Sequence, residues 1–409
     1  MSTSQTQIQA QIQAHVNGNV SSVSQARARL LAVEKKLNEI VIGHEDYVRG
    51  VMLALVAKEH VVLISPPGTA KSFLAHSLAR LLDARFYRYL LTRFTDYSEL
   101  FGAVDIRALA NGVYQRRWSN IVNADIVFLD EIFKANSAIL NSLLSMLQER
   151  VVYDPMTGET RSVALWTCIG ASNEVPQDEE LQALYDRFSV RIFGDYLNDD
   201  VAILRALEAR WIHAQNHVQL SPIASMEDVK AMHEYALRIL VSKIKQLDEP
   251  VYKIYHVNAV PLLKSLRSKG VLVSDRTIIE KFPKLYAAYL ALYGVTIDNL
   301  MNAVFDLLPY LAKDRSQLAD IKKVIEDSLG EVAELANKLE TAKNLIKGGD
   351  FKKAMEVLEE ILTFDVDRLS EKPWLKPRAE AIIRLARQYY DKLSNIIEQL
   401  KKFERSVEL

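Results

Sequence analysis

The sequence has 409 residues, which is more than one hydrophobic core of ordinary size can serve, so we expect two or three domains. Hydrophobic residues make up 49% of the chain and charged residues 25%, values that are typical of globular proteins and exclude wholesale disorder. Lysine plus arginine number 51 against 52 for aspartate plus glutamate, which excludes a global electrostatic field that would recruit nucleic acid or an acidic membrane.

Residues 1 to 22 are dominated by glutamine, serine and asparagine, so we predict a disordered tail there. From Val23 to about Gly43, apolar residues recur at helical spacing and predict an amphipathic helix. Near-continuous apolar runs separated by helical segments are typical of a parallel sheet covered on both faces. We therefore predict an α/β core over residues 23–212, with strands at 60–64, 86–91, 125–129 and 165–171.

Two stretches interrupt this pattern, Gly102 to Trp118 and Val151 to Ser162. Each has a strand-like pattern around a turn sequence, Asn111-Gly112 in the first and Thr157-Gly158 in the second, so we predict two inserted β-hairpins. After residue 212 the strand pattern fades, and we predict an all-α lid domain over residues 213–312, with helices at 226–246, 260–269 and 277–293.

Residues 313 to 409 predict an antiparallel arm of three helices. One apolar stripe runs from Leu318 to Leu339, and another repeats in steps of three and four from Ala386 to Phe403. Gly348-Gly349-Asp350 supplies a helix stop and an N-cap before the second helix, at 351–362, and the third helix follows Pro377.

A phosphate-binding loop is predicted where the strand at 60–64 leads into a helix. Such a loop wraps phosphates with backbone N–H groups, and the general pattern has glycine where this chain has Ser65 and Ala70. We expect Lys71 to reach the β- and γ-phosphates and the Ser72 hydroxyl to ligate Mg²⁺. The sequence thus predicts ATP and Mg²⁺ as cofactors, with the nucleotide held by Pro67, Gly68, Thr69, Ala70, Lys71, Ser72 and Phe73.

Polar residues follow the next two predicted strands at the same edge of the sheet. Asp130 and Glu131 end the strand at 125–129, so both carboxylates should lie beside the loop. We expect Asp130 to hold the Mg²⁺ hydration shell and Glu131 to orient and polarise the attacking water. Asn173, after the strand at 165–171, is either a contact to the γ-phosphate or water, or a turn residue.

The order and spacing of these motifs resemble the AAA+ ATPases, and specifically the MoxR branch, over about residues 24 to 300. The segments most similar to its RavA-like subgroup are 129–135, 171–174, 184–187 and 274–276. The resemblance implies a Walker A pair at Lys71 and Ser72, a Walker B pair at Asp130 and Glu131, and sensor 1 at Asn173. It also implies an arginine finger at Arg187, sensor 2 at Arg276, and an adenine-proximal segment at Ile42 and Gly43.

In related ATPases the arginine finger comes from the neighbouring subunit, so the resemblance implies a homo-oligomer, a closed or spiral hexamer. The inserted hairpins resemble pore-facing insertions of this branch. Arg107, Arg116 and Arg117 are then either substrate contacts or surface salt bridges. MoxR-type proteins work with partners that carry a von Willebrand factor A (VWA) domain, which implies chaperone-like remodelling or maturation of protein complexes.

Two other functions stay open at this stage. A nucleic-acid motor is disfavoured by the balanced charge and by the lack of an evident zinc cluster or winged helix in the sequence. A nucleotide-gated scaffold, polymerised through the arm, is suggested by the stripe at 386–403. The single cysteine, Cys168, excludes a disulfide framework, and the polar N-terminus lacks the apolar core of a signal peptide, so we predict a cytoplasmic protein with no membrane span.

Overall fold

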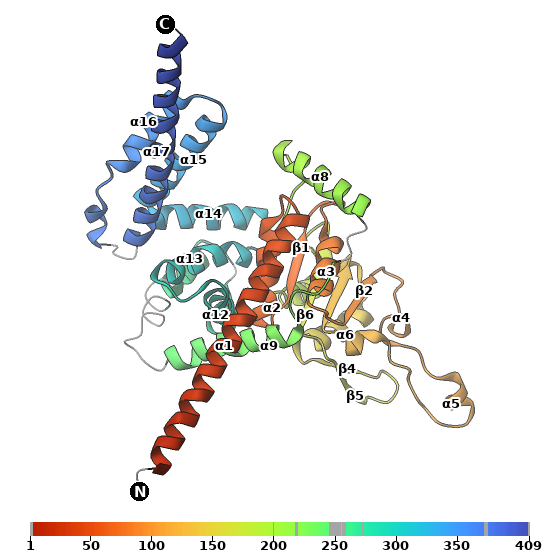
Figure 1. Ribbon diagram of the computed structural model, residues 1–409. Coiled ribbons are helices and arrows are strands. Elements are labelled where there is room, and N and C mark those ends of the chain that lie inside the picture. Colours follow the sequence, from red (N-terminus) through yellow and green to blue (C-terminus); the bar gives the residue numbers. More distant parts are fainter. Residues whose placement is uncertain are drawn as a thin grey trace.

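The computed structural model describes residues 3–198, 200–216, 220–244, 255, 259–271, 273–371 and 375–407. At its centre lies a five-stranded sheet in the order β2-β3-β6-β1-β7, with every pairing parallel (Figure 1). The predicted α/β fold is confirmed. The strands are β1 (Val61–Ile64), β2 (Phe86–Leu90), β3 (Ile126–Asp130), β6 (Thr167–Ser172) and β7 (Val190–Phe193).

The edge strand β7 was not predicted from the sequence. It has four residues and carries Arg191 in the middle of its apolar run, so its pattern is too short and too polar to stand out. Pairing with β1 and burial of the Arg191 side chain make this segment a strand, and both effects arise from the tertiary structure.

Both faces of the sheet are covered, as the apolar runs predict. In β1, Val61 and Leu63 belong to one hydrophobic cluster, whereas Val62 and Ile64 belong to another on the opposite face. Complete burial of each such side chain contributes about 1.5–3 kcal/mol. The first face packs against α1 (Thr3–Ile40), α2 (Glu45–Ala57), α3 (Lys71–Leu81), α9 (Met226–Ile244) and α12 (Phe282–Tyr293), and the second against α4 (Tyr97–Phe101), α6 (Ser137–Gln148) and α7 (Glu179–Tyr185).

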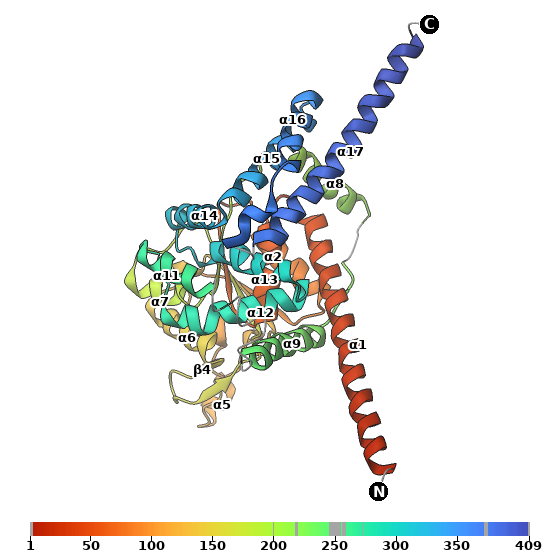
Figure 2. The ribbon, with the colours of Figure 1, turned by 90° about the vertical axis from the view of Figure 1, so that its left-hand side faces the viewer.

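The N-terminal segment differs from the prediction of a disordered tail, because α1 begins at Thr3. The buried residues of α1, from Ala26 to Leu37, fix its C-terminal half against α9 and α2. Since helix nucleation is the costly step, a helix held at one end can extend through a polar sequence. Figure 2 shows α1 and α17 projecting beyond the body in opposite directions.

The two insertions differ from each other. Residues 151–162 form the predicted hairpin, with β4 (Val151–Tyr153) antiparallel to β5 (Thr160–Ser162). Residues 102–118 do not form a β-hairpin: a single bridge joins Val104 to Arg116, and the apex is the short helix α5 (Ile106–Ala110). Asp105 caps that helix, and Gly112, at a φ of 76°, follows its C-cap residue, so the Asn-Gly pair ends a helix instead of turning a hairpin.

A buried ion pair locks the two insertions together. The Arg116 Nε lies 2.7 Å from the Asp154 Oδ2, and both side chains are at most 4% exposed. The Tyr114 hydroxyl donates to the other oxygen of Asp154 at 2.7 Å. Burial alone would raise the pKa of the Asp154 carboxyl, but the hydrogen bonds from Arg116 and Tyr114 bring that pKa down to about 2. Arg116 is therefore a structural residue and is not available to grip a substrate.

We expect Asp154→Asn to weaken the contact between the insertions by about 3 kcal/mol, because it leaves a buried guanidinium without its counter-charge. Native-state hydrogen exchange of the Asp105 and Arg117 amides, which bond across the first insertion, measures this loss. The matched control is Asp105→Asn, which breaks the ion pair with the 71% exposed Arg117 and should lower the protection of the Arg117 amide much less. If both substitutions lowered amide protection equally, the ion pair of Arg116 and Asp154 would not be what holds the two insertions together.

The remaining helices form the all-α part of the chain. The helix predicted over 226–246 corresponds to α9, and its last two residues lie outside the described ones. Besides α9 and α12, the described helical segments after β7 are α8 (Asp200–Asn216), α11 (Val260–Ser268), the π-helical turn η4 (Thr277–Lys281), α13 (Ile297–Leu307), η5 (Leu308–Leu311), α14 (Arg315–Leu329), α15 (Glu331–Lys347), α16 (Phe351–Leu362), η6 (Val366–Glu371) and α17 (Lys376–Val407). The core also contains the short 3-10 helices η1 (Asn120–Asn123) and η2 (Ile132–Lys134).

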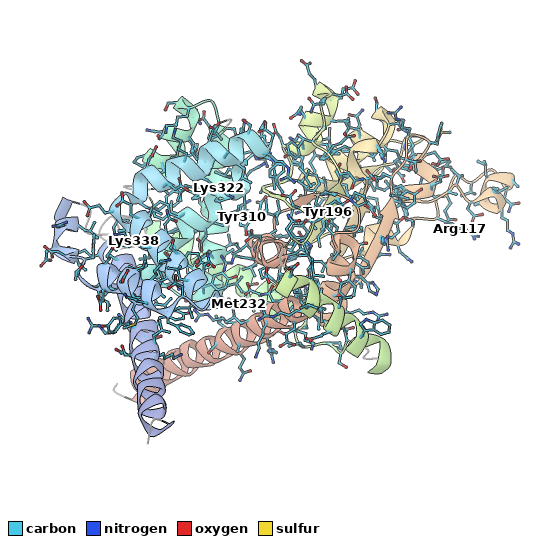
Figure 3. All side chains as sticks on the ribbon, turned by 90° about the horizontal axis from the view of Figure 1, so that it is seen from above. Arg117, Tyr196, Met232, Tyr310, Lys322 and Lys338 are labelled. Atoms are coloured by element: carbon cyan, nitrogen blue, oxygen red, sulfur yellow. The ribbon has the colours of Figure 1, made fainter. Side chains whose placement is uncertain are left out.

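Among its described residues the arm has one more α-helix than predicted, because Gly330, at a φ of 51°, divides the first predicted helix into α14 and α15. Ile321 and Val324 of α14 belong to the main core, whereas α15, α16 and α17 share a separate hydrophobic cluster. Viewed from above, Lys338 on α15 and Arg117 on the first insertion lie at opposite ends of the molecule (Figure 3).

Candidate nucleotide-binding site

The loop between β1 and α3 has the backbone that the sequence predicts for phosphate binding. Gly68 and Ala70 have φ angles of 83° and 59°, and a Cβ at Gly68 would meet nothing within 4 Å, so the loop leaves open space at this point. The Ser65 hydroxyl lies 2.6 Å from that of Thr69, which in turn donates to the Pro66 carbonyl at 3.0 Å. Serine at the usual glycine position thus braces the loop from within.

The Lys71 side chain, only 9% exposed, folds back over this loop. Its ammonium donates to the carbonyl oxygens of Ser65 at 2.6 Å and Pro66 at 3.0 Å, and to the Asn173 Oδ1 at 3.3 Å. Burial lowers the pKa of Lys71, whereas the charges of Asp130 and Glu131 act in the opposite direction. The ammonium is held by neutral oxygens, for which a phosphate could exchange.

At the carboxyl edge of the sheet, the structure brings three predicted residues together. The Asn173 amide accepts from Lys71 with its oxygen and donates to the Glu131 Oε1 at 2.9 Å with its nitrogen. Glu131 has a φ of 52°, the left-handed backbone that few non-glycine residues adopt, and its carboxylate also pairs with Lys134 at 3.4 Å. The loop lysine, the strand-end carboxylate and the next strand's asparagine therefore form one connected set.

The two predicted Mg²⁺ ligands also lie at this edge. Ser72 is the second residue of α3, and Asp130 is the last residue of β3, where Arg88 approaches its carboxylate to 3.9 Å. A hydroxyl and a carboxylate are the hard oxygen donors that Mg²⁺ prefers when phosphates complete its shell. The donor set thus fits a Mg²⁺–nucleotide complex.

A cavity of about 590 Å³ opens beside the loop. It is lined by Gly68, Ala70 and Phe73 of the loop and α3, and by Ala206 and Ala209 of α8. The predicted adenine-proximal residues Ile42 and Gly43 are not among its lining residues, although Ile40 is. Gly43 instead approaches Leu197, where a Cβ would lie 2.3 Å from that side chain's Cδ2 atom. The contribution of α8 was not predicted, because it depends on how a distant segment packs.

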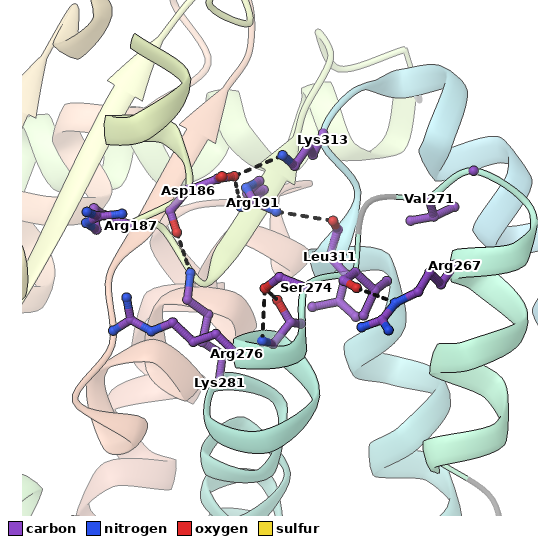
Figure 4. A pocket seen from close by; sticks show the side chains of 13 residues that line it. Asp186, Arg187, Arg191, Arg267, Val271, Ser274, Arg276, Lys281, Leu311 and Lys313 are labelled. Carbon is purple, nitrogen blue, oxygen red and sulfur yellow. Dashed lines mark hydrogen bonds and ion pairs between the residues drawn. The ribbon is translucent and has the colours of Figure 1, made fainter. Parts of the chain in front are cut away.

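The two predicted arginines meet in a second cavity, of about 500 Å³ (Figure 4). Arg187 follows α7, and Arg276 precedes η4. Arg187 and Arg276 therefore lie together, in a cavity that shares no lining residue with the one beside the loop. Its other cations, which sequence reasoning missed, are Arg191, Arg267, Lys281 and Lys313.

The second cavity is strongly cationic. The Arg187 Nε is buried and has no hydrogen-bond partner among the described residues. Burial and the nearby charge of Arg276 lower the pKa of Arg187, and burial lowers the pKa of Lys281 to about 8. Such a cluster, with an unpartnered guanidinium nitrogen, is suited to an anion supplied from outside the chain.

Comparison with known proteins agrees with this geometry. A family model described as the MoxR domain in the MoxR-vWA-beta-propeller ternary systems matches residues 28–234, just over half of the chain. The chain belongs to the MoxR family. The match covers α2, the phosphate-binding loop, every strand of the central sheet and α8. Of the charged residues just described, only Arg267, Arg276, Lys281 and Lys313 lie outside this MoxR domain.

Among relatives, this MoxR-family chain is 30% identical over 409 aligned residues to the uncharacterized protein MJ0079 of Methanocaldococcus jannaschii, covering 94% of this chain and 98% of that one. It is 26% identical to Chaperone MoxR1 of Mycobacterium tuberculosis over 117 residues, or 29% of this chain and 30% of that one. A solved structure of a proposed ATPase from Cytophaga hutchinsonii matches with a TM-score of 0.57 at 18% identity, covering 76% of this chain and 98% of the other. That structural likeness supports the AAA+ fold.

Within the described residues, no helix combines the length and the apolar character needed to cross a membrane.

Proposed function

We propose that this MoxR-family chain hydrolyses ATP to ADP and phosphate in a Mg²⁺-dependent reaction, as an oligomer that remodels or matures protein complexes. The observation that carries the proposal is the connected set of Lys71, Asn173 and Glu131 at the carboxyl edge of the sheet. Parallel α/β sheets bind ligands at this edge, and the three residues supply a cation, a polar amide and a carboxylate there.

In this proposal, Lys71 leaves the loop carbonyls for the β- and γ-phosphates, which frees the Asn173 oxygen. Asn173 continues to hold the Glu131 carboxylate, which orients the attacking water and accepts its proton. Ser72 and Asp130 would hold Mg²⁺, which supplies charge neutralisation at the phosphates when bound. The cavity lined by Phe73, Ala206 and Ala209 would take the base.

We further propose that Arg187 and Arg276 act together on the nucleotide of a neighbouring subunit. They share one cationic cavity, which has no lining residue in common with the cavity beside their own loop. An arginine supplied by a neighbour stabilises the charge of the transferring phosphoryl group. Hydrolysis would then need assembly, and we propose a hexameric ring or spiral.

The partner, the subgroup, the domain boundaries and the location are further parts of this proposal. The matching family model is described for ternary systems that contain a vWA component, which favours a VWA-domain partner, and placement in the RavA-like subgroup stays a prediction. We propose a core at 23–212, a lid at 213–312 and an arm at 313–409, and a cytoplasmic location. The hydrophobic cluster shared by α15, α16 and α17 supports an arm with a core of its own, which Phe305 of α13 joins to the lid.

The proposal is tested by ATP turnover measured against protein concentration, with light scattering on the same samples. We expect turnover per subunit to rise steeply as oligomers form, because each site would be incomplete in a monomer. Turnover that is independent of assembly, or absent in assembled protein, would contradict the proposal.

We expect Lys71→Met to weaken ATP binding by at least about tenfold and to abolish turnover, because a buried ammonium at the phosphates is lost. Binding of a fluorescent ATP analogue measures the first effect. Lys338→Met, on the exposed face of α15, is the matched control and should bind ATP like the wild type. Unchanged binding by Lys71→Met would remove the loop from the nucleotide site.

A further inference from the structure

The turn that carries Arg187 is tied to the helical part of the chain on both sides. The Tyr185 hydroxyl donates to the Lys313 carbonyl at 2.7 Å, and the Lys313 ammonium lies 3.0 Å from the Asp186 Oδ1. Arg191 reaches the same oxygen at 3.4 Å and donates to the Leu311 carbonyl at 3.2 Å. The turn between α7 and β7 is therefore bound to the segment that follows η5.

A second tether comes from η4. Lys281, which is 8% exposed, donates its ammonium to the Asp186 backbone carbonyl (Figure 4). Asp186, the residue directly before Arg187, thus contacts Lys313 through its carboxylate and Lys281 through its backbone carbonyl. Lys281 lies just before α12 and Lys313 lies after α13, so the two lysines flank this pair of helices. A shift of those helices relative to the sheet would therefore act on Asp186 through these two lysines.

Arg187 has little else to fix its direction. Its Nε is buried without a partner among the described residues, and the negative charge that acts on its guanidinium is that of the neighbouring Asp186. Its direction therefore depends on the backbone of the turn, which the contacts to Asp186 hold. The Asp186 side chain is itself 47% exposed, so its ion pairs contribute little to overall stability.

We infer that Asp186 is a positioning residue that couples the helical domain to the arginine of the neighbouring subunit's site. The contacts from Lys281 and Lys313 set the direction of Arg187, so a movement of the helical domain in one subunit would change catalysis in the next. The inference rests on the proposed function, since it assigns the regulation of that same shared site.

The test compares Asp186→Asn, Lys281→Met and Lys313→Met with Arg187→Ala, each as the full chain. We expect Asp186→Asn to lower kcat at least tenfold while KM for ATP, oligomer size and thermal midpoint stay close to wild type. Lys313→Arg should retain activity, because it keeps the ion pair. Adding Asp186→Asn to Arg187→Ala should cause no further loss, because both changes remove the same contribution.

Asp195→Asn is the matched control. Its ion pair with Arg315, at 2.8 Å, also joins the segment after β7 to the helical part, but neither residue lines the cavity of Arg187 and Arg276. It should leave kcat unchanged. An equal loss in this control, or a further loss on top of Arg187→Ala, would overturn the inference in favour of general loosening.

Different results would contradict the positioning role of Asp186 and the site shared between subunits. If Arg187→Ala is inactive but Asp186→Asn and both lysine variants have wild-type kcat, the positioning role is wrong and the shared site stands. If Arg187→Ala turns over ATP normally, the shared site itself is wrong, and the positioning role falls with it.

Discussion

Glu131→Gln should lower ATP turnover by about 10²–10⁴-fold while ATP still binds. The substitution keeps the size of the side chain and an oxygen for the Asn173 amide to bond, but removes the carboxylate that would accept a proton from water. The strained φ of 52° at this residue fits a backbone held for function. Steady-state phosphate release measures turnover, and equilibrium binding of a fluorescent ATP analogue measures affinity.

Glu174→Gln is the matched control for this experiment. Glu174 lies just beyond Asn173 at the same edge of the sheet, its side chain is exposed, and no partner of its carboxylate is found in the described part of the chain. It should turn over ATP like the wild type. If both variants lose activity equally, or if Glu131→Gln retains turnover, Glu131 is not the base.

The part of the site that lies on the sheet could be predicted from the sequence because the ends of the strands fix its geometry. The carboxyl ends of parallel strands meet at one edge, so the residues after 60–64, 125–129 and 165–171 had to lie close together. The bonds from Lys71 to Asn173 and from Asn173 to Glu131 are the result. The edge strand β7 was missed because Arg191 interrupts its short apolar pattern.

The residues that sequence reasoning missed owe their positions to tertiary packing. Lys281 and Lys313 reach the Asp186 turn from positions 95 and 127 residues further along the chain, and neither belongs to a local motif. Arg116 is similar in type to Arg107 and Arg117 in the sequence, yet it alone among the three is buried. A local sequence pattern assigns a cationic residue to a helix, a strand or a loop, but it does not identify the oxygen atom that the side chain will contact.

Mixing two inactive variants should restore activity, and this is the most direct test of a site shared between subunits. We expect Arg187→Ala to lose about 10³–10⁵-fold in turnover, as expected when an arginine finger is removed. Glu131→Gln is inactive for a different reason, since its own site lacks the base but its Arg187 is intact. In a mixed oligomer, an Arg187→Ala subunit with an intact Glu131 can receive Arg187 from a Glu131→Gln neighbour.

If subunits exchange at random in an equal mixture, about a quarter of the interfaces would pair an intact base with an intact arginine, so turnover should recover to a comparable fraction of wild type. The double variant Glu131→Gln/Arg187→Ala, mixed with either single variant, is the control, because no interface in that mixture is complete. Recovery in the first mixture alone shows that base and arginine come from different chains. Wild-type turnover by Arg187→Ala alone, or an inactive first mixture despite proven subunit exchange, would instead confine catalysis to one chain and leave the cationic cavity of Arg187 and Arg276 without a part in hydrolysis.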